Sequence, residues 1–334
     1  MKRKATTKCT RSASHAGSWY TDNPKQLNKQ LTGWLNVANK TLNNNNNLKK
    51  TSGGAKAIIA PHAGLSYSGP TAAWAYGAID PNRFKHVFIL GPSHHYYLSG
   101  CALSACDTYD TPLGNLIVDQ NINVELRKEG NHKMFDTMTK DEDEEEHSIE
   151  MHLPYVAKIM ESNKNYTVIP IIVGSLNVAD EIKFADILQK YFDDPENLFV
   201  ISSDFCHWGS RFSFQFHDEK FGEIYKSIRW LDQQAMELIE KQDANGFRAY
   251  LKKYRNTICG RNPISLMLQL IKRSKLTFNV EFTNYAQSSQ CIRISDSSVS
   301  YASCIVSEVA TTNTNDKDLN GGSGSSSQRS SKNK

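Results

Sequence analysis

The chain has 334 residues, of which 39% are hydrophobic and 10% aromatic, so it can build a sizeable core and is not a fully disordered polypeptide. The formal net charge of +4 is concentrated at the ends: residues 1–11 carry five bases and no acid, and residues 316–334 carry four bases and two acids. The remaining body is mildly acidic, which excludes the basic folded face of a nucleic-acid-binding protein.

Cysteine usage and hydropathy indicate the compartment. Seven cysteines are spread from Cys9 to Cys304 without a C-x-x-C pair, which argues against a disulfide framework and for a reducing environment. Residues 1–20 contain no apolar signal segment, and the chain contains no run of about 18 apolar residues. We therefore expect no membrane span and a cytoplasmic protein, with the nucleus as a second compartment.

Composition predicts one folded domain over residues 13–310. We expect a disordered basic tail at 1–12, a disordered Ser/Asn-rich tail at 311–334 and an Asn-rich surface loop at 43–54. The block of six acids at 141–146 is typical of a solvated loop.

Short apolar runs alternate with segments of helical periodicity along this domain. In chain order we predict a helix over 24–38, a strand over 56–60, a helix over 70–79, a strand over 86–90, helices over 119–129 and 147–162, a strand over 166–173, a helix over 178–192, a strand over 198–202, helices over 218–241, 243–255 and 263–273, and strands over 276–284 and 299–306. This alternation predicts an α/β fold with a largely parallel sheet covered on both faces, in which the last strands can be antiparallel.

Histidines follow three of the four buried strand candidates. His62 follows the first, His94 and His95 follow the second, and His207 follows the fourth. Because ligands bind outside the carboxyl ends of strands in open α/β sheets, these histidines can converge on one cleft.

Two further segments can contribute to the cleft. His15 precedes the first helix and can line its edge. His147 and His152 are five residues apart, so on a regular helix they point about 140° apart and would not chelate one ion together. One of them can still face the cleft together with Glu150.

Cys259 differs from the other cysteines in its local sequence. It lies just before Asn262-Pro263, a typical helix start, and close to Arg261. This position predicts a lowered thiol pKa and hence a metal ligand or nucleophile; a buried, inert thiol is the alternative. The cysteines expected to be small apolar fillers are Cys101, Cys106, Cys291 and Cys304.

Two histidines and one cysteine form a soft donor set with an open coordination position. Such a set suits Cu(I), Zn(II) or Fe(II), and the sulfur favours copper or zinc. We expect copper, with iron and zinc as alternatives.

Seven motifs, in order, closely resemble the Memo family, the mediator-of-cell-motility proteins, over about residues 12–307. They are SHAGSWY (14–20), APHAG (60–64), ILGPSHH (89–95), DEDEEEHSIEMHLPY (141–155), VISSDFCHWG (200–209), NTICGRNPI (256–264) and NYAQSSQC (284–291). The resemblance implies the fold of the class III extradiol ring-cleaving dioxygenases, a three-layer α/β/α arrangement around a mixed sheet.

The resemblance also implies the site. In the dioxygenases two histidines and a carboxylate hold Fe(II), whereas the equivalent positions here are His62, His94 and Cys259, with His207 at the position of the catalytic histidine. Replacement of a carboxylate by a thiolate weakens the case for a ring-cleaving Fe(II) enzyme and favours copper. The remaining residues expected to line the cleft are Trp19, Tyr20, His95, Trp208 and those of the two segments above.

The first functional hypothesis is a cytosolic copper protein in redox control. His207 would move protons, and Asp204 or Glu150 would orient a histidine ring through its second nitrogen. The Memo resemblance also implies a relay from receptor tyrosine kinases to the cytoskeleton in cell motility, with phosphotyrosine-containing signalling proteins and cytoskeletal regulators as partners.

The alternative from another class is a metal-independent binding module. A cleft lined by histidines and by aromatics such as Trp19, Tyr20, Tyr67 and Trp208 could accept a phosphotyrosine-containing segment. A third hypothesis is an active dioxygenase or hydrolase with an unidentified substrate.

Overall fold

The computed structural model describes residues 8–44 and 54–309. The predicted C-terminal tail lies outside the described residues, as does nearly all of the predicted loop at 43–54. The disordered tail expected at 1–12 is wrong for its described end, because Thr10–Arg11 forms strand β1 and Arg11 is fully buried.

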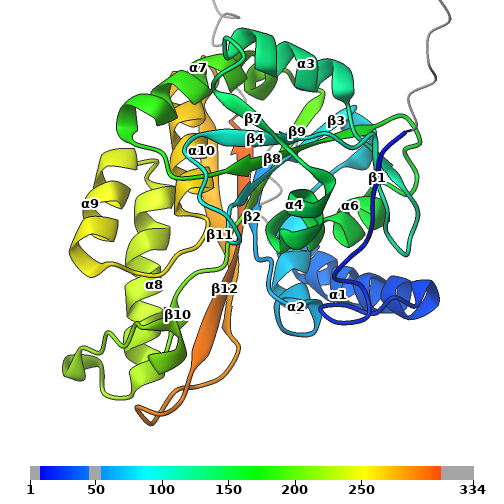
Figure 1. Cartoon of the computed structure of the whole chain (residues 1–334). Helices are drawn as coiled ribbons and strands as arrows, with labels where there is room; N and C mark the ends of the chain where they lie inside the picture. Colours follow the sequence, from blue (N-terminus) through cyan, green and yellow to red (C-terminus); the bar gives the residue numbers. More distant parts are fainter. Residues whose placement is uncertain (1–7, 45–53, 310–334) are drawn as a thin grey trace, which may run out of the picture.

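Within the described residues, one sheet of nine strands forms the centre of the molecule (Figure 1). Four neighbouring strands are parallel, in the order β2 (Ala55–Ala60), β9 (Asn197–Ser202), β3 (His86–Pro92) and β8 (Thr167–Val173). On the β2 side, β12 (Ser298–Glu308) pairs with β2, and β11 (Phe278–Gln287) and β10 (His207–Trp208) pair with β12. On the β8 side, β4 (Cys101–Ser104) pairs with β8, and β7 (Phe135–Met138) pairs with β4. Strands β11 and β12 pair antiparallel, which confirms that the sheet is mixed.

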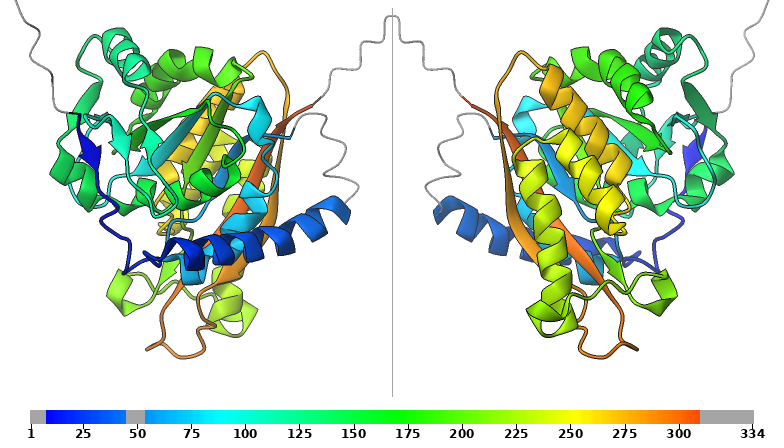
Figure 2. Two further views of the ribbon diagram at one scale, coloured as in Figure 1. Left: turned by 90° about the vertical axis from the view of Figure 1, so that its right-hand side faces the viewer. Right: turned by 90° about the vertical axis from the view of Figure 1, so that its left-hand side faces the viewer.

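Helices cover both faces of this sheet, which completes the three-layer α/β/α architecture (Figures 1 and 2). One layer contains α3 (Gln120–Glu129), α7 (Val178–Asp193), α8 (Ile224–Glu240), α9 (Ala244–Tyr254) and α10 (Arg261–Arg273). The other contains α1 (Pro24–Asn44), α2 (Leu65–Tyr76), α4 (Lys140–Glu145), α5 (His147–Glu150) and α6 (Leu153–Ile159). Short 3-10 helices occur at Pro81–Arg83, Ser210–Phe212 and Glu219–Phe221.

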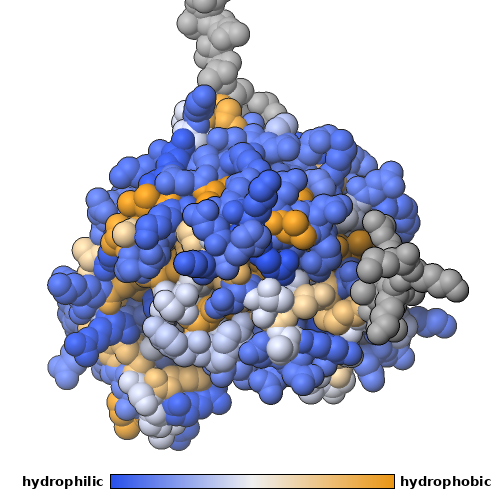
Figure 3. All heavy atoms as spheres, turned by 45° about the horizontal axis from the view of Figure 1, so that its top comes forward, coloured by the Kyte–Doolittle hydropathy of each residue, from blue (hydrophilic) through white to orange (hydrophobic). Residues whose placement is uncertain are grey.

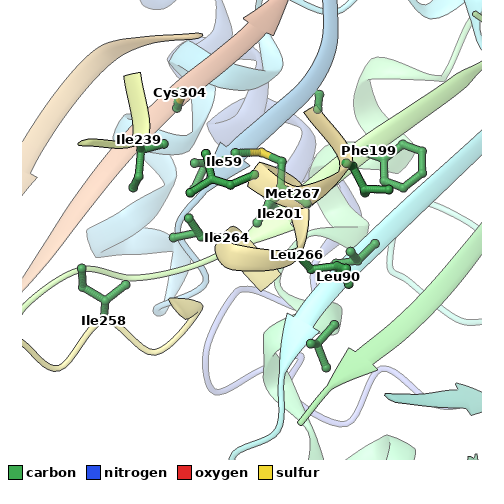
Figure 4. Packing of buried hydrophobic residues seen from close by; sticks show 14 of the residues in the cluster. Ile59, Leu90, Phe199, Ile201, Ile239, Ile258, Ile264, Leu266, Met267 and Cys304 are labelled. Carbon is green, nitrogen blue, oxygen red and sulfur yellow. The ribbon is translucent and has the colours of Figure 1, made fainter. Parts of the chain in front are cut away.

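Each face of the sheet has its own apolar core, because successive strand residues point to opposite faces. Ile59 packs in the core on the side of α7 to α10, whereas its neighbour Ile58 packs in the core on the side of α1, α2 and α6. Figure 4 shows Ile59 and Ile201 of the sheet beside Leu266 and Met267 of α10. The continuous apolar runs of the parallel strands follow from this burial on both sides.

A second, small sheet joins the N-terminal segment to the body. It consists of β1, β5 (Thr108–Tyr109) and β6 (Leu116–Ile117). A disulfide between Cys9 and Cys106 lies beside it. The expectation that Cys106 is only an apolar filler is therefore wrong.

The acidic block at 141–146 is not the solvated loop that its charge predicts. It forms most of α4, which begins at a capping box in which the Thr139 side chain accepts from the Glu142 backbone and the Glu142 carboxylate accepts from the Thr139 backbone. Asp143 is buried and pairs with Arg11 at 3.1 Å. A buried basic partner, absent from the local sequence, explains the difference.

The predicted helix over 147–162 is also interrupted. It divides into α5 and α6 around Met151, and Pro154 lies in the first turn of α6, where its missing N–H costs no bond. In the described segments no helix is long and apolar enough to cross a bilayer. The face in Figure 3 is mainly hydrophilic, with apolar side chains in scattered patches.

Candidate metal centre

The sheet order brings the ends of three parallel strands to one edge. Strand β9 lies between β2 and β3, so the loops that follow these strands are neighbours. They carry His62 after β2, His94 after β3 and Asp204 after β9. The fourth contributor, Cys259, comes from the turn before α10.

Three of these side chains form a compact group of donors. One ligand atom each of His62, His94 and Cys259 lies within 4.8 Å of the others. The Cys259 sulfur is 3.1 Å from Nε2 of His62, and the two imidazole rings are 5.2 Å apart, centre to centre.

The hydrogen bonds of His62 decide which nitrogen carries its proton. The Ser202 hydroxyl donates to the carbonyl of Ser148 at 2.7 Å, so it accepts from Nδ1 of His62 at 2.6 Å. The proton therefore lies on Nδ1, and the lone pair of Nε2 faces Cys259. Burial, followed by the neighbouring His94 and His147, lowers the pKa of His62 well below its ordinary value and keeps the ring neutral.

His94 is held in the same way by a carboxylate. Glu146 accepts the backbone N–H of His94 at 2.6 Å and its Nδ1–H at 2.9 Å. Burial opposes the charge of Glu146, but these bonds outweigh it and lower the Glu146 pKa to about 2. A permanent acceptor at Nδ1 leaves Nε2 of His94 as the free donor atom.

The Cys259 sulfur is placed by close backbone packing. A Cβ at the next residue, Gly260, would collide with the carbonyl oxygen of Ser202 and with Ser203, so glycine is required there. The backbone N–H of Asp204 donates to the sulfur at 3.2 Å.

The prediction of a lowered thiol pKa is wrong for the protein without metal. Burial and the nearby Asp204 raise the pKa of Cys259. The Arg261 guanidinium, which was expected to stabilise a thiolate, donates instead to the carbonyl of Ile258. A metal ion bound at this sulfur would therefore have to displace the thiol proton, which would leave to solvent.

The residues present fit a soft metal ion. Two imidazoles offer oriented Nε2 atoms, and the sulfur adds a soft third donor. The group borders a cleft of about 360 Å³ whose wall includes His94, His95, Tyr97, Arg261 and Cys259. A three-donor site beside a cleft leaves a coordination position open for an exogenous molecule.

His207 begins the short strand β10, and two carbonyl groups fix the orientation of its ring. Its Nδ1–H donates to the carbonyls of Phe205 and Thr257 at 2.9 and 3.1 Å. Both partners are acceptors, so Nε2 is the nitrogen that can take or release a proton. The Thr257 hydroxyl also accepts from the His207 backbone N–H at 2.7 Å.

Asp204 does not orient a histidine ring. Its carboxylate accepts backbone N–H groups of His62 and Ala63 at 2.9 and 3.4 Å. Burial raises the Asp204 pKa, and the neighbouring His207 opposes this shift. Asp204 thus fixes the path of the chain that presents His62.

His147 lies against the metal donors, whereas His152 points into the core. The His147 ring stacks on His94 at 4.4 Å and lies 4.4 Å from the Trp19 ring. Burial and the nearby His94 lower the His147 pKa to about 3. His152 is buried and shares a hydrogen bond with Tyr76 at 2.8 Å.

Glu150 holds the N-terminal segment against this wall. It accepts from Nη1 of Arg11 at 2.6 Å, from the Tyr20 hydroxyl at 2.9 Å and from Nδ1 of His15 at 2.8 Å. It therefore orients the ring of His15, which is not one of the three donors.

Two residues expected to line the cleft are buried elsewhere. Trp208 is completely buried in the core, and its indole N–H donates to the carbonyl of Phe216 at 2.9 Å. Tyr20 is also buried and offers only its hydroxyl to Glu150. Both belong to motifs that contain core residues as well as cleft residues. Neighbouring residues in an extended segment point to opposite sides, so one motif can supply both.

Sequence reasoning missed the residues that orient the donors, namely Ser202, Glu146 and Gly260. Glu146 is adjacent to His147 and lies in a recognised motif, so that proximity was an available signal. Ser202 and Gly260 also lie in recognised motifs, but nothing in their local sequence indicates which donor they position.

Comparisons with known proteins agree along most of the chain. A family model described as Memo-like protein matches residues 11–305. The proteins named Protein MEMO1 of Rattus norvegicus and Homo sapiens are each 53% identical over 296 residues, which is 87% of this chain and 95% of theirs. Protein memo-1 homolog of Caenorhabditis elegans is 48% identical over 302 residues, 89% of this chain and 82% of its own. The crystal structure of uncharacterized protein JW3007 from Escherichia coli K12 matches with a TM-score of 0.38 and 12% identity, over 74% of this chain and 98% of that one.

Proposed function

Because this chain belongs to the Memo-like protein family, we propose that it is a cytoplasmic copper protein that acts in redox control through His62, His94 and Cys259. The observation that carries the proposal is the convergence of two oriented imidazole nitrogens and one sulfur within 4.8 Å at the edge of a cleft.

When bound, copper would supply one-electron redox chemistry between Cu(I) and Cu(II). Ser202 and Glu146 hold the two imidazoles with Nε2 free. With the metal bound, Cys259 would release its proton to solvent, and the N–H of Asp204 would stabilise the resulting thiolate. His207, whose Nδ1–H is held by two carbonyls, would take or give a proton at Nε2.

The donor set favours copper over iron. Fe(II) ring-cleaving enzymes use a carboxylate ligand. One ligand atom each of Glu146, His94 and His147 lies within 4.8 Å of the others, but both carboxylates beside the donors already accept hydrogen bonds. Glu146 holds the ring and backbone of His94, and Asp204 holds the backbone of His62 and Ala63. The soft sulfur therefore selects a soft ion, with zinc as the closest competitor.

A chemical assay tests the redox role. We expect equimolar wild-type protein to suppress hydroxyl-radical formation by copper and ascorbate, because bound copper is withdrawn from free exchange. His62→Ala should lose this protection, whereas Lys85→Ala, at a surface ion pair remote from the donors, should keep it. Equal protection by wild type and His62→Ala would reject the proposal.

A metal-independent adaptor role is the second candidate. Trp19 and Tyr67 are exposed aromatics at 37% and 64%, and Arg261 lies in the cleft wall. These groups could receive a phosphotyrosine side chain. Binding of a phosphotyrosine peptide that persists unchanged in a metal chelator, with no copper affinity, would favour this function over the first.

We also propose, from family membership, a role in relaying receptor signals to the cytoskeleton. Cells that lack the protein should migrate more slowly, and wild type should restore their speed. Failure of His62→Ala to restore it would connect migration to the metal donors, and full restoration would separate the two roles.

A further inference from the structure

A buried carboxylate on α8 has no ionic partner among the residues that the structure describes. Asp232 lies on α8 and is completely buried. None of the ion pairs among the described residues includes it. Its contacts are neutral donors: the Cys206 backbone N–H at 3.1 Å, the Asn256 side-chain amide at 3.0 Å and the Tyr285 hydroxyl at 2.9 Å.

Two of these donors belong to the two loops that carry reactive groups. Cys206 directly precedes His207, and Asn256 lies three residues before Cys259. Both donate to the same oxygen, Oδ1 of Asp232. One acceptor atom is therefore shared by the loop of the proton-moving histidine and the loop of the sulfur donor.

A second connection runs between the same loops closer to the cleft. Thr257, the neighbour of Asn256, accepts from the His207 backbone N–H and donates to the His207 carbonyl at 2.9 Å. Its own carbonyl accepts Nδ1–H of His207. Any shift of the Asn256 loop relative to Cys206 would therefore alter the hydrogen bonds that fix the His207 ring.

We propose that Asp232 is a positioning residue that keeps the His207 loop and the Cys259 loop in one register. Asp232 contacts neither the three metal donors nor the cleft, and it acts through its hydrogen bonds with Cys206 and Asn256. The effect of Asp232 on copper binding rests on the proposed function. Its effect on the position of the His207 loop can be tested in the protein without metal.

The chemistry of a carboxylate suits this task. It only accepts hydrogen bonds, and its two oxygens can serve donors from several elements at once. Burial raises the Asp232 pKa to about 6, against the hydrogen bonds from Ser300, Asn256 and Tyr285. A neutral amide keeps one oxygen acceptor, so Asp232→Asn can preserve the bond shared by the two loops.

A buried carboxylate of the same helical layer provides a matched control. Glu181 on α7 is 3% exposed and pairs with Arg248 on α9. It also accepts from Gln269 on α10. Removal of the Glu181 side chain should destabilise the fold, but Glu181 makes no hydrogen bond to the His207 loop or the Cys259 loop.

The experiment compares Asp232→Ala, Asp232→Asn and Glu181→Ala without metal, by nitrogen-15 chemical shifts of the His207 ring and amide hydrogen exchange. We expect Asp232→Ala to replace the single Nδ1–H form of His207 by a mixture of tautomers and to speed exchange at Cys206 and His207 at least tenfold. Asp232→Asn should restore wild-type behaviour, and Glu181→Ala should leave both readouts unchanged. Cu(I) affinity, measured by competition with a chromophoric chelator, should fall about tenfold in Asp232→Ala alone.

A wild-type His207 tautomer and exchange rate in folded Asp232→Ala would overturn the inference, as would the same changes in Glu181→Ala. If Asp232→Ala does not fold, Asn256→Ala removes the shared bond while Asp232 stays in place, and it should produce the same ring and exchange changes. Absence of copper binding by wild type would reject the proposed function, while the metal-free readouts would still decide the role of Asp232.

Discussion

The Ser202 hydroxyl accepts Nδ1–H of His62 at 2.6 Å because its own proton is committed to the Ser148 carbonyl. This relationship gives His62 one tautomer and turns Nε2 toward the Cys259 sulfur. Orientation of a ligand by such outer contacts is a general feature of metal sites.

Ser202→Ala should weaken copper binding about 10- to 100-fold, because the ring loses the acceptor that fixes its proton. Ser68→Ala is the matched control, since Ser68 is equally buried and donates to the nearby Ala63 carbonyl without touching a ring. Competition with a Cu(I) chelator measures both. Equal affinity losses in the two variants would show that general damage to this region, and not the ring contact, sets the affinity.

Gly260→Ala should destabilise the protein by about 1–3 kcal/mol and displace Cys259 from the other donors. The added Cβ would collide with Ser202 and Ser203, and this backbone cannot yield as a flexible side chain would. Denaturant unfolding and copper titration measure the two effects.

Gly33→Ala provides the comparison for that change. Gly33 lies inside α1 with no atom near an added Cβ, so the substitution should stabilise the protein by about 0.5–1 kcal/mol through helix propensity. Its copper affinity should not change. A Gly260→Ala protein with native stability and affinity would refute the close packing described for this turn.

Glu150 should make folding depend on pH in the acid range. Burial opposes its charge, but His15 and Arg11 lower the Glu150 pKa to about 2 from an ordinary value of 4.5. A depressed carboxyl pKa contributes stability that is complete above the unfolded pKa and is lost as pH falls from about 4.5 toward 2. The difference corresponds to about 3 kcal/mol of unfolding free energy.

Glu150→Gln tests this dependence. At pH 7 it should unfold at a lower denaturant concentration than wild type, and the gap should narrow steadily below pH 4.5. A gap that stays constant down to pH 2.5 would contradict the assigned role of the Glu150 charge.

The main elements of the fold were predictable because the sequence carries their causes locally. The four parallel strands are continuous apolar runs, and histidine-bearing loops follow three of them, which allowed the approach of His62 and His94 to be expected. The small strands β4 and β7 were missed because they are short and flank the sheet away from that pattern.

The details of the site depend on contacts between distant segments. The local sequence around Cys259, with a helix start and Arg261, predicts a lowered pKa, whereas burial beside Asp204 raises it. The acids at 141–146 predict a solvated loop until Arg11, more than 130 residues earlier, is seen to pair with Asp143. Local charge is therefore a poor guide wherever the partner or the burial comes from tertiary structure.

Anaerobic Cu(I) titration of wild type and Cys259→Ser, with metal content by mass spectrometry, tests the central claim most directly. The proposed site predicts tight one-to-one binding by wild type and its loss when oxygen replaces sulfur, because a hydroxyl at this position is not a soft ligand. Absence of binding, or wild-type affinity in Cys259→Ser, would contradict a copper centre formed by His62, His94 and Cys259.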